Sequence, residues 1–258
     1  EEIENDDKKL LSEKMVYSVS QIQTYKSCPK KYMYQYIYKI PTQSRHYFSF
    51  GTSVHEVLEH MAKTIGQQPK EMLYASSIAK LHNSWISQGY ESHIQEKEYF
   101  NKGIEALRDF IETQTELIKD KREIVGTEQT FTLELEGKKI YGIIDRIDKI
   151  GNDYEILDYK TSNSMETEEN LKKNIQLYVY ALAIKELKGK FPEKVALWYL
   201  IHDKIKYVKI DLHNIEEIKK EILGIISEIE KGVFNPTPSF FACKFCDFNK
   251  ICPESKEN

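Results

Sequence analysis

Two aspartates and a lysine lie close together in the segment GIIDRIDKIGNDYEILDYKTS (Gly142–Ser162), whose alternating apolar and polar residues predict a β-hairpin. If the central Gly-Asn dipeptide forms a two-residue turn, Asp145 lies directly opposite Asp158 across the hairpin. Carboxylates in that position repel each other unless something offsets their charge. Lys160 lies two residues beyond Asp158 and therefore points to the same side of the sheet. The pattern predicts two carboxylates and one ammonium group on a single patch.

A divalent cation between the two carboxylates would offset this repulsion. Mg²⁺ binds through a few carboxylates, keeps several waters and accepts phosphate oxygens, so such a site can polarise a phosphodiester and supply a hydroxide. The main-chain carbonyl of Tyr159 could add an oxygen ligand, and Lys160 could position or deprotonate the attacking water or stabilise charge on the phosphate. The competing interpretation is a hairpin whose charged groups only face water. The spacing alone leaves both open, because D-x-K is common by chance.

Two further acidic residues near this patch are interpreted as lying outside the site. Asp148 has the opposite parity to Asp145, so we expect it on the solvated side of its strand. Glu128, near the start of the preceding strand, could be a third acidic group of the site, but we favour a structural role for it.

The four cysteines of the chain form a second pattern. Three of them follow the spacing C-x₂-C-x₅-C near the end of the chain, and the fourth can complete a set of four ligands if the two ends of the chain meet. Four thiolates suit either a structural Zn²⁺ or an iron–sulfur cluster, and the spacing does not separate the two. Two disulfides are disfavoured because the chain shows no sign of export, and unrelated buried thiols are the remaining interpretation. The residues are Cys28, Cys243, Cys246 and Cys252.

Composition and charge exclude several classes of protein. The 258 residues carry 37 Lys and Arg against 41 Asp and Glu, a net charge of −4, so DNA binding would depend on a local basic groove or on metal ions. No apolar run approaches the length of a membrane span, and the N-terminal residues are charged. We therefore expect no membrane association and a cytoplasmic, intracellular location. The chain begins with Glu rather than Met, as a processed or excised piece would.

The hydrophobic pattern predicts an α/β chain. Residues 1–15 are mostly polar and predict a loose arm, residues 16–258 predict one domain, and a helical insertion is predicted over about residues 67–123. The other expected helices are two short ones within Ser18–Ile40, followed by Gly51–Lys63, Glu168–Leu187 and Asn214–Lys231. The expected strands are Glu128–Leu135, Lys138–Lys149, Asp153–Thr161, Lys194–Ile201 and Lys204–Leu212.

The motifs around these residues resemble the core of the PD-(D/E)XK nuclease superfamily, in the variant carried by RecB-type exonucleases. GIIDRID followed by EILDYKTS holds the two aspartates and the lysine. GTSVHEVLEH resembles a motif whose His contacts the metal, here His55, and QLYVYALA resembles a motif with Gln and Tyr four residues apart, here Gln176 and Tyr180. YSVSQIQTYKSCPKKYMYQY resembles the N-terminal segment of the family. Ile144 stands where the nominal pattern has Pro, and Asp158 where it has Glu, and both are ordinary in RecB-type members.

This resemblance implies a restriction-endonuclease-like core, with a central mixed sheet flanked by helices, and a site for Mg²⁺ or Mn²⁺. The implied metal ligands are His55, Asp145, Asp158 and the Tyr159 carbonyl. The implied catalytic residues are Asp145, Asp158, Lys160, Gln176 and Tyr180. From the residues alone, His55 would be a structural histidine and Gln176 and Tyr180 would pack against the sheet. By resemblance, His55 contacts the metal, and the other two touch the DNA backbone or position Lys160.

The placement of the cysteines, one before the nuclease core and three after it, resembles iron–sulfur nucleases of the AddB and CRISPR-associated RecB-like kinds. It implies a [4Fe–4S] cluster, with Zn²⁺ as the less favoured occupant, that joins the N-terminal segment to a C-terminal cysteine segment at residues 236–253. Closing so long a loop removes conformational entropy from the unfolded chain, so a structural role needs no redox chemistry.

Together these features predict a metal-dependent DNA nuclease, an exonuclease acting on single-stranded DNA or DNA ends in repair, recombination or defence. The polar start and the missing Met keep open a place as the nuclease module of a helicase–nuclease, with a helicase subunit or domain as partner. The alternative function is a catalytically inactive DNA-end-binding module with a structural metal cluster. A binding module has no need of the repulsive pair Asp145 and Asp158, which argues against it.

A basic and aromatic groove for DNA is a further hypothesis. Three lysines interleave with the tyrosines of residues 25–38 and Arg45 follows them, so these cations could neutralise phosphates while the rings stack bases. For the tyrosines we favour packing into the core. The cations are Lys26, Lys30, Lys31 and Arg45.

Overall fold

A mixed β-sheet lies at the centre of a computed structural model that describes residues 16–119 and 122–256. The arm predicted for residues 1–15 lies outside the described residues. The strand order is β1-β3-β4-β5-β6, with β2 also paired to β3. The β1–β3 and β4–β5 pairs are parallel and the others antiparallel. The strands are β1 (Val16–Ser18), β2 (Arg122–Leu135), β3 (Lys138–Ile150), β4 (Asp153–Lys160), β5 (Lys194–Tyr199) and β6 (Lys204–Lys209).

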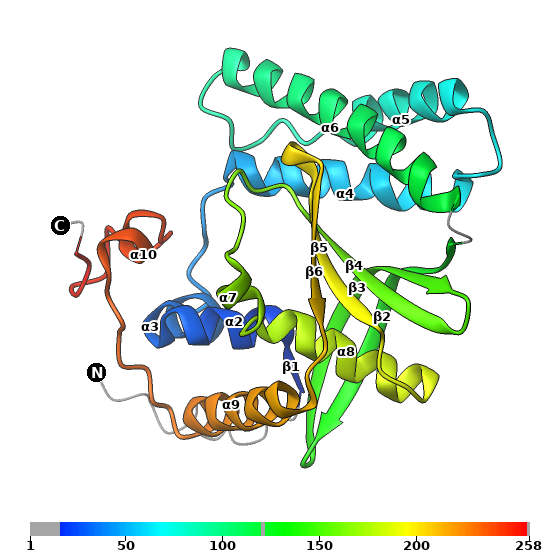
Figure 1. Cartoon of the computed structure of the whole chain (residues 1–258). Coiled ribbons are helices and arrows are strands. Elements are labelled where there is room, and N and C mark those ends of the chain that lie inside the picture. Colours follow the sequence, from blue (N-terminus) through cyan, green and yellow to red (C-terminus); the bar gives the residue numbers. More distant parts are fainter. Residues whose placement is uncertain (1–15, 120–121, 257–258) are drawn as a thin grey trace.

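Helices cover both faces of the sheet (Figure 1), which confirms an α/β fold of the kind that a restriction-endonuclease-like core has. One face is covered by α4 (His46–Thr64), α5 (Lys70–Ser84) and α6 (His93–Lys119). The other is covered by α2 (Val19–Ser27), α8 (Ile175–Lys188) and α9 (Leu212–Glu230). The short helices are α3 (Pro29–Tyr32), η1 (Met33–Ile37), α7 (Glu168–Leu171), η2 (Leu200–His202) and α10 (Phe240–Lys244). Within the described ranges, none of the helices is both long and apolar enough to cross a membrane.

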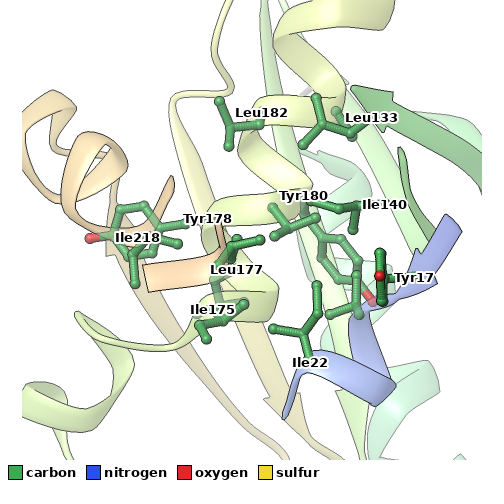
Figure 2. Close-up of a cluster of buried hydrophobic side chains, with 14 of the residues drawn as sticks. Tyr17, Ile22, Leu133, Ile140, Ile175, Leu177, Tyr178, Tyr180, Leu182 and Ile218 are labelled. Atoms are coloured by element: carbon green, nitrogen blue, oxygen red, sulfur yellow. The ribbon is translucent and has the colours of Figure 1, made fainter. Parts of the chain in front are cut away.

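The core is divided between the two faces of the sheet. On one face α8 is buried on all sides except in its last turn, and Leu177 and Tyr178 are both 0% exposed; Figure 2 shows both side chains in the core. On the other face Phe110 of α6 packs against Trp198 of β5, with ring centroids 4.5 Å apart. A helix that is apolar on every side belongs in a core. The sheet and the helices on either side of it therefore form a rigid frame for polar groups at the strand ends.

The hairpin of β3 and β4 has the register that its Gly-Asn turn predicts. Gly151 has φ 60°, which suits a tight hairpin turn, and Ile150 pairs with Asp153. Continuing the register one residue beyond the last pair places Asp145 opposite Asp158.

Several element boundaries were predicted wrongly. β2 begins at Arg122, well before the predicted start at Glu128. A bulge between Ile124 and Gly126 interrupts the alternation of apolar and polar residues there, so the sequence pattern did not reveal the first part of the strand. The single helix predicted over residues 168–187 is two helices, because the side chain of Asn174 caps α8 by accepting hydrogen bonds from two backbone N–H groups of its first turn. β1 was not predicted because three residues are too few to show an alternating pattern.

The prediction that Asp148 lies on the solvated side of its strand is also wrong. Asp148 is 0% exposed and accepts two hydrogen bonds from the guanidinium of Arg146, at 2.6 and 2.7 Å. Arg122 pairs with both Asp148 and Glu155, and Gln114 of α6 accepts a hydrogen bond from Arg146. The alternation of side chains along the strand correctly placed Asp148 and Asp145 on opposite faces of the sheet. The sequence did not show that α6 covers the face on which Asp148 lies.

Removing one partner of this buried ion pair should strongly destabilise the fold. Asp148→Ala leaves Arg146 buried without its carboxylate, so we expect the free energy of unfolding to fall by about 3–5 kcal/mol. Asp153→Ala is the matched control, since that aspartate is exposed and pairs with Lys190 at the surface, and should cost less than about 1 kcal/mol. Urea unfolding of the two variants measures the difference. Equal losses would contradict a structural role for the buried pair.

Candidate active site

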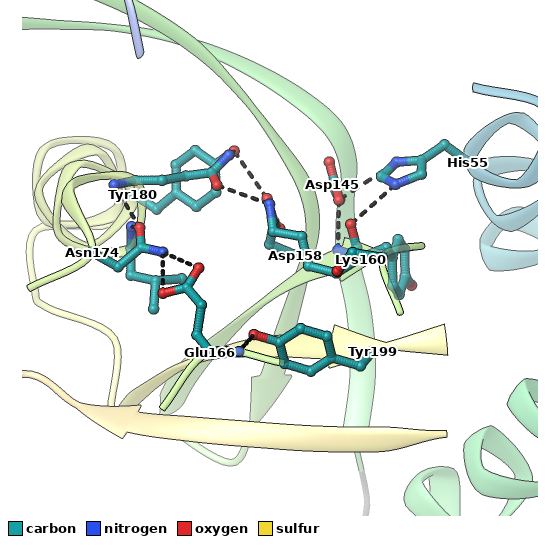
Figure 3. A network of polar contacts seen from close by, with 12 residues as sticks. His55, Asp145, Asp158, Lys160, Glu166, Asn174, Tyr180 and Tyr199 are labelled. Atoms are coloured by element: carbon teal, nitrogen blue, oxygen red, sulfur yellow. Dashed lines mark hydrogen bonds and ion pairs between the residues drawn. The ribbon is translucent and has the colours of Figure 1, made fainter. Parts of the chain in front are cut away.

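The ends of β3 and β4 bring the predicted carboxylates and the lysine together (Figure 3). Lys160 Nζ lies 2.6 Å from Asp158 Oδ2. Asp145 Oδ2 accepts a 2.7 Å hydrogen bond from the backbone N–H of Tyr159. Asp158 is only 2% exposed. The three charged groups expected from the spacing thus meet on one patch.

Helix α4 brings His55 to the same patch. The helix approaches the end of β4 closely at Gly51, where an added Cβ would lie 3.1 Å from Thr161 Oγ1. His55 Nε2 donates to the Tyr159 carbonyl at 3.1 Å, and Nδ1 faces Asp145 Oδ2 at 3.6 Å. Burial lowers the pKa of His55, so the ring is neutral and Nδ1 carries a lone pair. Two acceptors therefore face each other, and a cation between them would resolve that arrangement.

Glu128, which we favoured as structural, contributes a third carboxylate to this group. It lies on β2 between Thr127 and Gln129, and these two pair with the residues on either side of Asp145. Glu128 is therefore opposite Asp145, and ligand atoms of Glu128, Asp145 and His55 lie within 4.8 Å of one another. Three adjacent strands each supply one carboxylate at the same level of the sheet.

The negative charges of this row of three carboxylates, Glu128, Asp145 and Asp158, are not balanced by nearby positive charges. Burial and the neighbouring Asp158 raise the pKa of Asp145 well above its usual range. Burial and the nearby carboxylates also raise the pKa of Glu128. Burial is the largest single influence and lowers the pKa of Lys160, but the charge and hydrogen bond of Asp158, together with the charges of Asp145 and Glu166, outweigh it. The pKa is therefore raised and the amine stays protonated. One ammonium thus faces three carboxylates.

Gln176 and Tyr180 connect Lys160 to Asp158 in a closed ring of hydrogen bonds. Lys160 Nζ donates to Gln176 Oε1 at 3.0 Å, and Gln176 Nε2 donates to the Tyr180 hydroxyl at 2.8 Å. The Tyr180 hydroxyl donates to Asp158 Oδ1 at 3.3 Å. The resemblance implies that Gln176 and Tyr180 either touch the DNA backbone or position Lys160. The hydrogen bond between Lys160 and Gln176 agrees with the second role.

The patch opens to the surface through two neighbouring cavities. One, of about 650 Å³, is lined by residues that include His55, Glu128 and Lys160. The second, of about 330 Å³, shares Lys160 and Ser162 with the first. The lysine therefore lies between two depressions that a chain-like ligand could occupy together.

Comparison with known proteins identifies the family. The PD-(D/E)XK nuclease superfamily matches residues 16–253, nearly the whole chain. The chain belongs to the PD-(D/E)XK nuclease superfamily. This membership explains why an acidic pair and a lysine share the ends of two neighbouring strands.

Relatives of this nuclease differ in size. It is 26% identical to the "Gene 69 protein" of Mycobacterium phage L5, over 93% of this chain and 96% of that protein. It is 27% identical to an ATP-dependent helicase/deoxyribonuclease subunit of Carboxydothermus hydrogenoformans, over 80% of this chain but 22% of that protein. The solved structure of SSO0001 aligns with 96% of this chain and 95% of its own chain, at 18% sequence identity and a TM-score of 0.43.

Three tyrosines of the hypothetical basic and aromatic groove, Tyr25, Tyr32 and Tyr34, pack into the core, as we favoured, whereas Tyr38 is 41% exposed. Tyr25 and Tyr32 are 2% and 0% exposed, with ring centroids 5.6 Å apart. Lys26 pairs with Glu221 at 2.8 Å. The buried rings of Tyr25 and Tyr32 are therefore not available to stack on bases.

The four cysteines, from both ends of the described chain, line one cavity of about 220 Å³. All four are free thiols. Cys28 lies between α2 and α3, whereas the others lie in or after α10. The structure thus brings the N-terminal and C-terminal segments side by side at the cysteines.

The repulsion at Asp145 gives a prediction for stability. The pKa of Asp145 is higher in the folded protein than in the unfolded chain, where it is about 3.9. The carboxyl group therefore favours folding at a pH below the unfolded-chain pKa, and this contribution to stability is lost as the pH rises through the folded-state pKa. At neutral pH without divalent metal, Asp145→Asn should therefore raise the melting temperature, by about 2–4 °C for each kcal/mol of repulsion relieved. Mn²⁺ should raise the melting temperature of the natural protein and leave that of the variant almost unchanged.

Differential scanning fluorimetry with and without Mn²⁺ measures both effects, and Asp153→Asn, an exposed carboxylate elsewhere on the sheet, is the control. Two results would contradict the proposed charge imbalance. One is a metal-free Asp145→Asn protein with a lower melting temperature than the natural protein. The other is a Mn²⁺-induced rise in melting temperature as large in the variant as in the natural protein.

Proposed function

We propose that this chain is a metal-dependent deoxyribonuclease that degrades single-stranded DNA or DNA from its ends. The observation that carries the proposal is the row of carboxylates from Glu128, Asp145 and Asp158, with neutral His55 at one side and the Lys160 ammonium at the other. Such a row destabilises the fold unless a cation shares it.

The donor set suits a six-coordinate ion. Octahedral Mg²⁺ with bonds of about 2.1 Å places opposite ligands about 4.2 Å apart, and the ligand atoms of His55, Glu128 and Asp145 lie within 4.8 Å of one another. The Tyr159 carbonyl is at hand beside His55, and Asp158 would join as a ligand by sharing its carboxylate with Lys160. An imidazole among oxygens favours Mn²⁺ more than an all-oxygen site would.

The side chains around the site divide the chemistry between them. The bound cation would polarise the phosphodiester and lower the pKa of a water bound to it. Lys160 is held protonated beside Asp158, so it stabilises negative charge on the phosphate rather than removing a proton from water. Gln176 and Tyr180 keep the lysine and the aspartate in fixed positions through their hydrogen bonds.

A nuclease activity assay tests this assignment. With Mn²⁺ or Mg²⁺ and single-stranded oligonucleotides, Asp158→Ala and Lys160→Ala should each lower kcat at least about 100-fold, because each removes charge that acts on the reacting phosphate. Asp153→Ala should retain full activity. Circular single-stranded DNA, which has no end, should resist degradation.

Two outcomes would contradict the proposal. Undiminished cleavage by Asp158→Ala would show that the acidic row is not the active site. Binding of DNA ends by the natural protein without any cleavage would favour the alternative, a catalytically inactive end-binding module.

We also propose that the four cysteines hold a structural [4Fe–4S] cluster. All four line one cavity of about 220 Å³, and four thiolates suit either a structural zinc ion or an iron–sulfur cluster. The resemblance to iron–sulfur nucleases, with one cysteine before the core and three after it, favours the cluster. Asp247, next to Cys246, accepts a 3.0 Å hydrogen bond from Arg45 at the start of α4, so the cysteine segment is connected to the helix that carries His55.

Metal analysis tests the cluster. Protein purified without oxygen should be brown and contain about four iron atoms per chain, and Cys28→Ser should lose the colour and lower the melting temperature. Ser27→Ala, one residue away, should keep both. A colourless protein with one zinc per chain would contradict the cluster.

The biological setting is proposed on the same basis. Repair, recombination or defence each require DNA ends to be degraded. The match to less than a quarter of a helicase/deoxyribonuclease subunit supports a helicase subunit or domain as the partner of this nuclease.

A further inference from the structure

Two exposed aromatic rings at the mouth of the larger cavity have no part in the proposed chemistry. Tyr47 is 40% exposed and Phe48 is 60% exposed. Both line the cavity that His55 and Lys160 also line. Their ring centroids are 4.6 Å apart with the planes tilted by 49°. Adjacent exposed rings at the edge of a cavity indicate a binding surface rather than part of the core.

The position of the rings on α4 relates them to the metal site. Phe48 precedes His55 by 55 − 48 = 7 residues, which is about two turns of helix, so the two side chains share one face about 10 Å apart along the axis. A DNA strand with one phosphate beside His55 would therefore bring a neighbouring nucleotide to the rings.

The cavity offers few charges that could hold a DNA backbone. Its lining residues include Glu56, Glu59 and Glu128 against Lys160, and the first two glutamates are paired with lysines. Non-specific DNA affinity normally comes from clusters of cations that neutralise phosphates. Here that contribution is small, so binding must draw on the metal site and on contacts that do not depend on charge.

We propose that Tyr47 and Phe48 form a stacking platform for one unpaired base of single-stranded DNA, about one to three nucleotides from the phosphate at the metal site. This proposal rests on the proposed nuclease function and names its substrate as an unpaired strand. Bases within a duplex are already stacked on their neighbours, so the platform selects single strands and frayed ends.

The second cavity gives the rest of the strand a place beyond Lys160. Its lining includes Ser162, whose hydroxyl donates to the Ser164 carbonyl, and Thr167, whose hydroxyl can donate to a phosphate oxygen without adding charge. The loop that carries them is fixed, because the Glu166 backbone N–H donates to the Tyr199 hydroxyl at 2.9 Å. The strand would run from the rings, over the lysine, to this loop.

Binding measurements test the platform without requiring cleavage. The probe is a fluorescent single-stranded oligonucleotide in Ca²⁺, checked on a gel to be intact, with affinity read from anisotropy. Phe48→Ala should weaken binding about 5- to 150-fold, whereas Phe48→Trp should preserve it. Ile94→Ala is the control, because that side chain is 74% exposed and lies outside the cavity. A blunt duplex should bind Phe48→Ala and the natural protein equally.

A series of oligonucleotides with one abasic position each provides a test that does not depend on folding of a variant. One position should weaken binding by the natural protein as much as Phe48→Ala does, and Phe48→Ala should be insensitive to that same lesion. If single strands bind and are cleaved but neither the ring nor any single base matters, the platform is wrong and the nuclease function stands. If the natural protein neither binds nor cleaves DNA, the proposed function itself fails.

Discussion

Repulsion among three carboxylates is the constraint on which the rest of this structure depends. Glu128, Asp145 and Asp158 come from three adjacent strands and lie at one level of the sheet, where like charges destabilise the fold. Burial makes the repulsion stronger, since it raises the pKa of Asp145 in addition to the effect of its neighbours. A lysine and a neutral histidine do not balance these charges. The arrangement becomes favourable once a divalent cation is shared, which is the state that the proposed function requires.

The surrounding frame holds the row in place. On one side of the sheet α8 fixes Lys160 and Asp158 through Gln176 and Tyr180. On the other side α4 brings His55 against the end of β4. The cysteine segment reaches the start of α4 through Arg45 and Asp247. The cysteine segment is thus connected to the helix that carries His55, so the proposed cluster would support the site without any redox role.

Much of this site could be predicted from the sequence because short-range geometry determines it. A tight turn at Gly151 sets the register of the hairpin, and the register sets Asp145 opposite Asp158. The same reasoning applied to the turn at Glu136 and Gly137, which have φ 47° and 79°, would have placed Glu128 opposite Asp145. The bulge earlier in β2 obscured how far that strand extends, and Glu128 was assigned a structural role.

What could not be predicted depends on long-range packing. Asp148 resembles a solvated residue because no local pattern shows that α6 covers its side of the sheet or that Arg146 and Arg122 accompany it into the interior. Contacts of this kind join elements far apart in the chain, and a single sequence contains no record of them.

Anomalous diffraction from crystals soaked in Mn²⁺ would show whether a cation occupies the acidic row. We expect a manganese peak in bonding contact with Asp145, Glu128 and His55 Nδ1, with the Lys160 ammonium nearby but not bound. Manganese at saturating concentration that leaves this position empty, or that binds through none of the three carboxylates, would contradict a shared cation as the group that balances their charge.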